Sequence, residues 1–538
     1  MAQFSGAVKL ADLNDFIAPS QACVVNINAS GKAQVQLDFS DFDIRPEVGA
    51  VQPQQRPAVG FQQTAPTGPN GAIKVTLQDC LACSGCVTSA ETILLEHQSA
   101  EEFVSKLAQP DTTVLVSVSP QSRAALAAYY GLSSAETMSR LSGFFKGLGV
   151  KAVLDTNTGR DIALLEAAAE FLERYKAAHP GPEQHENGIA DMEVEERRMS
   201  GHKAGTTGRA DGSTGQNGHA SGHALAAGRQ QQQGRSTLPM LASACPGWVC
   251  YAEKSHGDTV LPFISTTRSP QAVMGQLLKG HLAHQWGVNP ASIYHCAVMP
   301  CYDKKLEASR EDFNLPGTKI PEVDSVLTSG EVQQLLQSHG RPLPAIAQAP
   351  LDTLVPGVQD DPRLYGIPGG SGGYLQYIFR TAARELYGID VPWSEPLPLR
   401  VLRNADFREV TLEHDGRAVL RFALAYGFRN IQTIVRKMKR KSCEYDYVEV
   451  MACPSGCLNG GGQLKAGQGQ SQQQLLDQLD AIYHDPEVQL RLPEQNPTVA
   501  ALYSAMAGAG VGSEGAKRLF HTGYHKREKT LTQAAGDW

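Results

Sequence analysis

Three features are missing from this sequence, and each absence excludes a class of protein. No apolar run approaches the roughly 18 uninterrupted residues that a membrane-spanning helix needs. The first residues, MAQFSGAVKLADLNDFIAPS, are acidic early and lack the charged and apolar regions of a secretory signal or transit peptide. There is no basic excess, because the formal net charge is −7, so nucleic acid and anionic membranes are not the default partners. We therefore expect a soluble cytoplasmic protein, and the nucleus stays open as a second location.

The cysteines are also not those of a disulfide framework. Their number is odd, at 11, and a reducing compartment does not maintain structural disulfides. In such a protein, cysteines that bunch at short spacing are usually metal ligands. The isolated residues Cys250, Cys296 and Cys443 are more often small buried side chains. We assign them no role.

The length, the composition and the pattern of apolar residues in this chain are typical of a globular α/β protein. It contains 538 residues, of which 41% are hydrophobic and 19% charged, enough for several units of ordinary size. From Thr112 onward, short apolar runs such as TVLVSVSP and GVKAVLD alternate with helical patterns such as residues 161–176. This alternation predicts a parallel sheet covered by helices. Residues 181–237 have no aromatic side chain, and we predict a disordered insertion there.

Three cysteines near the N-terminus have the C-x2-C-x2-C spacing: Cys80, Cys83 and Cys86. This spacing lets the backbone wrap so that three thiolates face one four-iron cube, whereas zinc sites more often have separated pairs or histidines. No cysteine follows Cys86 closely, so a remote ligand must complete the set. We assign Cys23, the only other cysteine in this region. A cluster with three protein ligands is the competing interpretation.

A second group of cysteines follows predicted strands. Cys245, Cys301 and Cys453 each come directly after an apolar run, and Cys457 follows four residues later in C-P-S-G-C. Loops at the carboxyl ends of strands converge on one crevice in open α/β sheets, so this pattern is what one shared metal site would produce. The glycines at 460–462 allow the backbone to approach a bulky inorganic core. Spacing alone does not link these four cysteines.

Three segments resemble the cluster-binding motifs of iron-only hydrogenases. They are SACPGW (243–248), MPCYDKKLE (299–307) and EVMACPSGCLNGGGQ (449–463), and VSVSPQSRAALA (116–127) is similar to the first strand–helix unit of that family. The resemblance implies an α/β, iron-only hydrogenase-like fold, with two lobes of twisted parallel sheet flanked by helices and an N-terminal cluster-binding region.

The same resemblance implies the ligand set and the division of the chain. Cys245, Cys301, Cys453 and Cys457 would hold a four-iron cluster between the lobes, so that the two groups of cysteines bind two [4Fe-4S] clusters. The expected segments are an N-terminal cluster region (1–108), the first part of the first lobe (109–180), the insertion (181–237), the remainder of the first lobe (238–350), the second lobe (351–484) and a small-subunit-like tail (485–538).

Two departures separate this chain from the hydrogenases. Those enzymes carry a proton-relaying cysteine immediately before the SACP-type ligand, and here that position is Ala244, which cannot transfer a proton. Their methionine-bearing segment has Pro368–Tyr374 as its apparent counterpart, and this segment, PGGSGGY, lacks the methionine. Lys304 and Glu307 match the hydrogenases, but a scaffold ion pair explains them equally well.

The pattern instead resembles the eukaryotic hydrogenase-like cytosolic iron–sulfur assembly factors, also called the nuclear prelamin A recognition factor-like family. These have a cysteine near residue 20, C-x2-C-x2-C, ACPGW, and a tail like LFHTGYHKREK (519–529) that ends in tryptophan. The resemblance implies a non-enzymatic role with no catalytic residue, linking an upstream cluster scaffold to the targeting complex that serves cytosolic and nuclear apo-proteins. An iron-only hydrogenase and an electron carrier or redox sensor remain the alternatives.

The chain ends in Asp537-Trp538, and tryptophan is rare here, at four residues. Most termini are frayed, but tryptophans often anchor binding hot spots, and backbone amides can capture a terminal carboxylate. In the family that this tail resembles, a terminal aromatic residue preceded by an acid docks proteins onto the targeting complex. Gly536 replaces the bulky apolar residue usual there. We expect Asp537 and Trp538 to bind that complex.

Deleting Trp538 should therefore weaken the association with the targeting complex by at least about 2 kcal/mol, the usual scale of a hot spot. The iron content should not change, because neither residue is expected to hold a cluster. Co-purification and titration with the complex measure the first effect, and iron analysis measures the second. Unchanged affinity after the truncation would show that this tail has no docking role.

Overall fold

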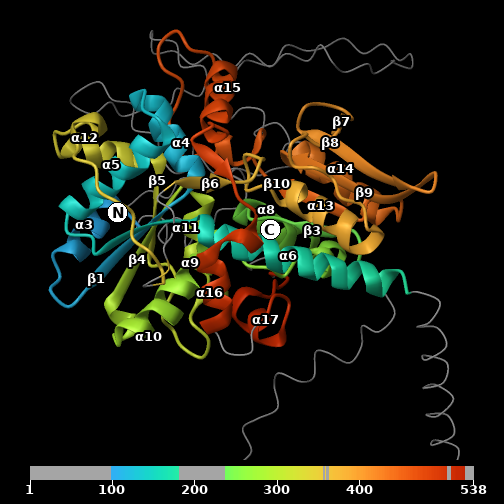
Figure 1. Ribbon diagram of the computed structural model, residues 1–538, viewed down its shortest axis with the longest axis horizontal. Helices are drawn as coiled ribbons and strands as arrows, with labels where there is room; N and C mark the ends of the chain where they lie inside the picture. Colours follow the sequence, from blue (N-terminus) through green and yellow to red (C-terminus); the bar gives the residue numbers. More distant parts are fainter. Residues whose placement is uncertain (1–97, 181–236, 356–357, 359–362, 506–509, 528–538) are drawn as a thin grey trace, which may run out of the picture.

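The computed structural model describes residues 98–180, 237–355, 358, 363–505 and 510–527, and Figure 1 shows their arrangement. Outside the described residues lie Cys23, Cys80, Cys83, Cys86, the segment 181–236, Asp537 and Trp538. What the sequence predicts for these positions stays a prediction. No helix in the described ranges is long and apolar enough to cross a membrane.

The first sheet has four parallel strands in the order β2-β1-β4-β5. The strands are β1 (Thr113–Val118), β2 (Ala152–Asp155), β4 (Ile293–Met299) and β5 (Ser325–Thr328). Every residue of β4 is buried, as expected for a parallel strand covered on both faces. One face packs on α3 (Ala100–Leu107), α4 (Pro120–Tyr130), α5 (Ser134–Gly147) and α12 (Ser329–Ser338). This part of the α/β prediction is confirmed.

The second sheet has five strands in the order β3-β10-β9-β8-β7. They are β3 (Met240–Ala242), β7 (Arg400–Val401), β8 (Phe407–His414), β9 (Arg417–Tyr426) and β10 (Tyr447–Met451). Strands β3, β10 and β9 are parallel, but β8 and β7 run antiparallel. The expectation of a parallel second sheet therefore holds for β3, β10 and β9 and is wrong for β8 and β7. The reason is the two-residue turn Asp415-Gly416, whose positive φ angles of 49° and 71° form a tight hairpin between β8 and β9.

Strand β3 lies in this second sheet, where it pairs with β10, although the predicted division placed residues 238–350 in the first lobe. A short strand has no sequence signal for its partner, because pairing depends on the tertiary fold. The boundaries of the other segments stay predictions.

Helix α6 (Asn157–Ala178) joins the two sheets into one core. Leu154 of the first sheet and Phe422 and Tyr447 of the second belong to the same buried cluster as α6. Phe171 contributes directly, since its ring centroid lies 5.0 Å from that of Phe422 and 5.9 Å from that of Tyr447. In Figure 1, α6 runs below the five-stranded sheet toward the right. The same core includes α8 (Pro246–Val260), α9 (Pro270–Gly275), α13 (Tyr374–Tyr387) and α14 (Phe428–Lys439).

The C-terminal segment wraps back over both halves. Helix α15 (Gln472–Tyr483) packs on α4, and β11 (Val488–Leu490) pairs with β6 (Leu364–Gly366). Helices α16 (Pro497–Ala505) and α17 (Glu514–Phe520) add Leu502 and Phe520 to the main core. The remaining elements are α10 (Ala283–Trp286), α11 (Asp303–Ala308), the π-helix η4 (Gln276–Leu282), and the 3-10 helices η3 (Leu261–Phe263), η5 (Pro290–Ser292), η6 (Glu311–Phe313), η7 (Leu343–Ala345), η8 (Gly456–Asn459) and η9 (Pro493–Gln495).

Replacing Phe171 with alanine should destabilise the chain by about 3–5 kcal/mol, because it removes a fully buried ring between the two sheets. The measurement is the shift of the urea unfolding midpoint. Val401→Ala is the matched control, because Val401 is 56% exposed, and its effect should stay below about 0.5 kcal/mol. Equal shifts in the two variants would contradict the role of α6 as the joint between the sheets.

Candidate metal centre

Three strands deliver the four predicted cysteines to one place. Cys245 follows β3 and is the N-cap residue of α8. Cys301 lies two residues after β4, and Cys453 two residues after β10, with Cys457 in η8. The strand-end pattern read from the sequence is confirmed, but the strands come from both sheets: β4 belongs to the first, β3 and β10 to the second.

The loops that carry Cys301 and Cys457 are joined directly. The Gly462 amide donates to the carbonyl oxygen of Pro300 at 2.9 Å. A side chain at Gly460 would collide with that same carbonyl, and a Cβ atom at Gly462 would lie 2.6 Å from Thr328 Cγ2. Glycine is therefore required at both positions, because the backbone of the second sheet's loop packs against that of the first.

A strained turn shapes the loop between the last two cysteines. Ser455 and Gly456 have φ angles of 58° and 71°, and a side chain at Gly456 would overlap the Ser371 hydroxyl. The Cys457 amide donates to Ser371 Oγ at 3.1 Å. Ser371 belongs to the PGGSGGY segment, so this segment supports the cysteine loop. Sequence reasoning missed this contact, although a run of four glycines around one serine was a signal of close backbone packing.

Burial raises the pKa values of all four thiols, and repulsion from neighbouring thiols adds to this for Cys245, Cys301 and Cys453. Burial raises the pKa of the Cys245 thiol to about 12, and the nearby Asp303 carboxylate and Cys457 add to the effect. Burial likewise raises the pKa values of Cys301 and Cys453 well above the usual range, with further contributions from Asp303 and the neighbouring thiols. Cys457 contributes to the raised pKa values of the other three thiols, so the four cysteines lie close together. They become thiolates readily only when positive charge is supplied, as a bound metal does.

The residues around the thiols fit an iron–sulfur cluster. The Ala452 amide points at Cys245 Sγ at 3.4 Å, and hydrogen bonds of this kind to sulfur tune iron–sulfur centres. Among the described residues, no three His, Cys, Asp or Glu side chains are grouped tightly enough to hold one metal ion. In a four-iron cube each thiolate binds a different iron, so four separate cysteines are the donor set that such a group uses.

Lys304 and Glu307 form a buried ion pair, with Nζ to Oε2 at 3.0 Å. Ser269 donates to the same carboxylate, and the Gln271 amide donates to the Lys304 carbonyl at 3.1 Å. The scaffold interpretation of this pair is consistent with these contacts. The positive charge of Lys304 also acts on the cysteines. It lowers the pKa values of Cys301 and Cys457, although burial has the larger, opposite effect.

The three isolated cysteines lie apart from this arrangement. Cys296 is fully buried in β4, whereas Cys250 and Cys443 are half-buried. Cys296 and Cys443 pack against apolar side chains, whereas Cys250 lines a cavity together with Glu253 and Arg310.

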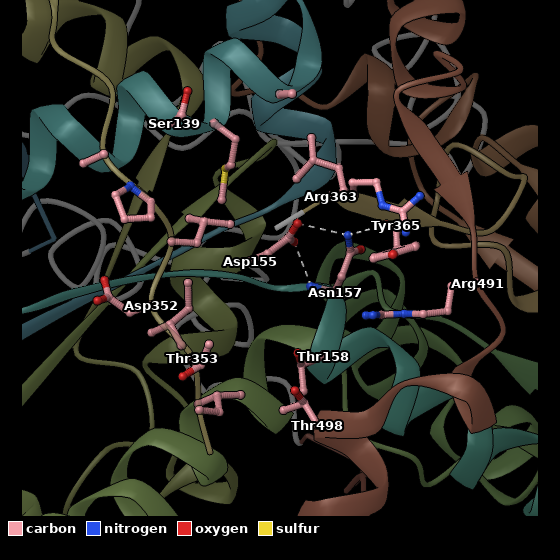
Figure 2. A pocket seen from close by; sticks show the side chains of 18 of the residues that line it. Ser139, Asp155, Asn157, Thr158, Asp352, Thr353, Arg363, Tyr365, Arg491 and Thr498 are labelled. Atoms are coloured by element: carbon pink, nitrogen blue, oxygen red, sulfur yellow. Dashed lines mark hydrogen bonds between the residues drawn. The ribbon is translucent and has the colours of Figure 1, made fainter. Parts of the chain in front are cut away.

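A cavity of about 600 Å³ lies elsewhere in the fold. Figure 2 shows its lining, which includes Asp155, Asn157, Tyr365 and Arg491, with the Asn157 amide hydrogen-bonded to Asp155. None of the four cysteines lines it. The cavity is therefore separate from the candidate metal centre.

Comparison with known proteins agrees with this geometry. The family described as iron only hydrogenase large subunit, C-terminal domain, matches residues 112–184 and 206–461, and iron hydrogenase small subunit matches residues 472–527. Protein NAR1 of Arabidopsis thaliana is 43% identical over 100% of this chain and 99% of its own length. Cytosolic Fe-S cluster assembly factor narfl of Xenopus tropicalis is 44% identical over 99% of each chain. Cytosolic iron-sulfur assembly component 3 of Rattus norvegicus is also 44% identical over 99% of each.

The chain belongs to the hydrogenase-like family of cytosolic iron–sulfur assembly factors. Its membership implies iron–sulfur clusters. Among solved structures, the apo form of [FeFe]-hydrogenase HydA1 from Chlamydomonas reinhardtii superposes with a TM-score of 0.61 at 24% identity, covering 79% of this chain and 98% of the hydrogenase. This likeness shows the fold, an α/β arrangement with parallel strands flanked by helices.

Replacing Cys453 with serine should remove about half of the iron, because each four-cysteine set is expected to hold one cube. It should also lower the melting temperature, since cluster binding is coupled to the folding of the junction between the sheets. Iron and sulfide analysis after anaerobic reconstitution, together with thermal unfolding, measures both effects.

Two matched variants complete this test. Cys83→Ser should lose a similar share of the iron but keep the fold, and Cys443→Ser should change neither. Iron loss in Cys443→Ser, or equal destabilisation by Cys83→Ser and Cys453→Ser, would contradict the assignment.

Proposed function

We propose that this chain is a non-enzymatic component of cytosolic iron–sulfur cluster assembly that binds two [4Fe-4S] clusters. The observation that carries this proposal is the full-length similarity to proteins named as cytosolic assembly factors, together with four cysteines that the fold brings to one junction. Cys245, Cys301, Cys453 and Cys457 would hold one cluster, and Cys23, Cys80, Cys83 and Cys86 the other. A cubane bound at either set supplies a store of iron and sulfide and a one-electron redox centre.

The protein's own residues hold and shield the group at the junction. The glycines at 460 and 462 let the two loops close on each other, and Ser371 orients the backbone of Cys457. Lys304 places a positive charge beside the thiolates, while its partner Glu307 keeps that charge in position. Cys245 is only 8% exposed, whereas the residues Cys301, Cys453 and Cys457 are half-buried, so their part of the site is closer to the surface.

The partners in this proposal are an upstream cluster scaffold and the targeting complex that serves cytosolic and nuclear apo-proteins. Asp537 and Trp538 would bind the targeting complex. Support comes from the similarity of the tail to that of the family and from the names of the relatives, one of which is called a component of cytosolic iron–sulfur assembly.

The alanine at position 244 is inconsistent with hydrogenase chemistry. Ala244 packs against the main core beside the cysteine ligand and has no titratable group, so it cannot pass a proton to a neighbouring reaction centre. The second alternative is an electron carrier, which would use the same two clusters to pass electrons and would not donate their iron and sulfide. An assembly factor transfers iron and sulfide to an apo-acceptor, whereas an electron carrier transfers electrons alone, so this transfer distinguishes the two functions.

We expect no hydrogen evolution or uptake from this chain, even when it is produced together with hydrogenase maturation factors, because the proton-relaying side chain is missing. Gas chromatography with a chemical electron donor is the measurement. The Cys453→Ser variant, which should lack the junction cluster, sets the background. Turnover clearly above that background would overturn the non-enzymatic assignment.

A further inference from the structure

Helix α14 and the two residues that follow it carry a row of exposed cations without acidic partners. Arg429, Arg436, Lys439, Arg440 and Lys441 are all exposed. In the described part of the chain none of them forms an ion pair with a carboxylate; Arg436 contacts the Thr433 hydroxyl and Lys439 contacts His256. Residues 400–445 contain eleven Lys and Arg but only five Asp and Glu, although the whole chain has a net charge of −7. The basic charge is therefore local.

The fold accounts for only part of this row. The helix dipole favours Arg436 and Lys439, which lie in the last turn of α14, but the effect is confined to that turn. Arg429 lies in the first turn of α14, where the dipole disfavours a positive charge. Arg436 and Arg440 are four residues apart, a spacing at which like charges repel on a helix surface. Such a pattern costs stability, so a role outside the fold explains it better than helix formation.

The row has a fixed orientation, because the opposite face of α14 is buried. Ile431, Ile434 and Val435 lie in the main core, and the ring of Phe428 packs on Tyr251 of α8, with centroids 5.2 Å apart. In Figure 1, α14 lies beside β9 of the five-stranded sheet. Arg429, Arg436 and Arg440 are spaced seven and four residues apart, so they share one face.

This face begins at the cysteine loop. Gly427 immediately precedes α14, and its amide donates to the Met451 carbonyl at 2.8 Å. A Cβ atom at Gly427 would lie 3.6 Å from Pro454 Cγ. Pro454 and Ser455, between the ligand candidates Cys453 and Cys457, are exposed. The exposed part of the cysteine loop thus lies beside Gly427, two residues before Arg429 at one end of the basic row.

We propose that the exposed face of α14, from Arg429 to Lys441, together with Pro454 and Ser455, is the docking site for an acidic protein that exchanges clusters with this chain. The inference rests on the proposed function, since it names the kind of partner for the junction cluster. Twelve residues of helix span about 18 Å, which matches one patch on a compact protein. The net negative charge of the remaining chain repels an extended polyanion or a charged membrane.

The test uses the full chain and a variant in which Arg436, Lys439 and Arg440 are each replaced by glutamine. The probe is a fluorescein-labelled peptide of alternating glutamate and alanine, followed by fluorescence anisotropy at low and physiological ionic strength. The original chain should bind the peptide in a salt-dependent manner, and the triple variant should bind it at least about tenfold more weakly. The single variant Arg429→Gln should also weaken binding, because Arg429 places the site beside the cysteine loop.

The matched control is the combined variant Lys151→Gln, Lys176→Gln and Lys319→Gln. These three lysines are exposed elsewhere on the surface, and their replacement removes the same number of positive charges. Peptide binding that survives in the triple α14 variant, or is lost equally in the control, would overturn the proposal. So would tighter binding of a single-stranded RNA or of phosphatidylserine vesicles through the same three residues, since the partner would then be a polyanion or a membrane.

Iron content separates this inference from the proposed function. The triple variant changes only exposed side chains, so after reconstitution it should hold the same iron and sulfide as the original chain. Lost peptide binding with unchanged iron supports the docking site. Normal peptide binding by a chain that takes up no cluster would show that the assembly function is wrong while the basic face still binds acidic protein.

Discussion

The contact between two loops, Pro300–Cys301 and Cys453–Gln463, is the constraint on which the rest of the site depends. One loop ends a strand of the four-stranded sheet and the other a strand of the five-stranded sheet. The two loops can meet because residues 460 and 462 have no side chain. The Gly462 amide then donates a hydrogen bond to the Pro300 carbonyl. Any larger residue at these two positions would separate the loops and, with them, the cysteines that they carry.

The electrostatics of this junction link the fold to its ligand. Burial holds the pKa values of the four thiols high, with added repulsion between thiols at Cys245, Cys301 and Cys453. The charge of Lys304 opposes this effect at Cys301 and Cys457. A folded junction with four thiolates and no compensating charge would be unfavourable, so binding of a positively charged iron–sulfur core and closure of the loops should stabilise each other. The main core does not need this help, because α6 already packs against both sheets through Leu164, Phe171 and their neighbours.

Much of this arrangement could be predicted from the sequence, and the failures have physical causes. Apolar runs that end in cysteine indicated three strand ends, since the carboxyl ends of parallel strands are where ligands gather. The sequence did not indicate that Cys301 belongs to a different sheet from Cys245, because strand pairing is decided by tertiary contacts. The antiparallel edge of the second sheet was missed because the Asp415-Gly416 turn was not recognised. Ser371 was missed because a single serine in a glycine run has no spacing signal toward a cysteine that lies 86 positions away.

We propose that cysteines from both sheets hold one four-iron cube. It is tested most directly by Mössbauer spectroscopy of an iron-57-reconstituted chain in which Cys80, Cys83 and Cys86 are all replaced by serine. With the N-terminal set removed, we expect about four irons per chain with the spectrum of a single [4Fe-4S] cluster. One mononuclear iron, a two-iron cluster, or no bound iron in a chain that remains folded would contradict it.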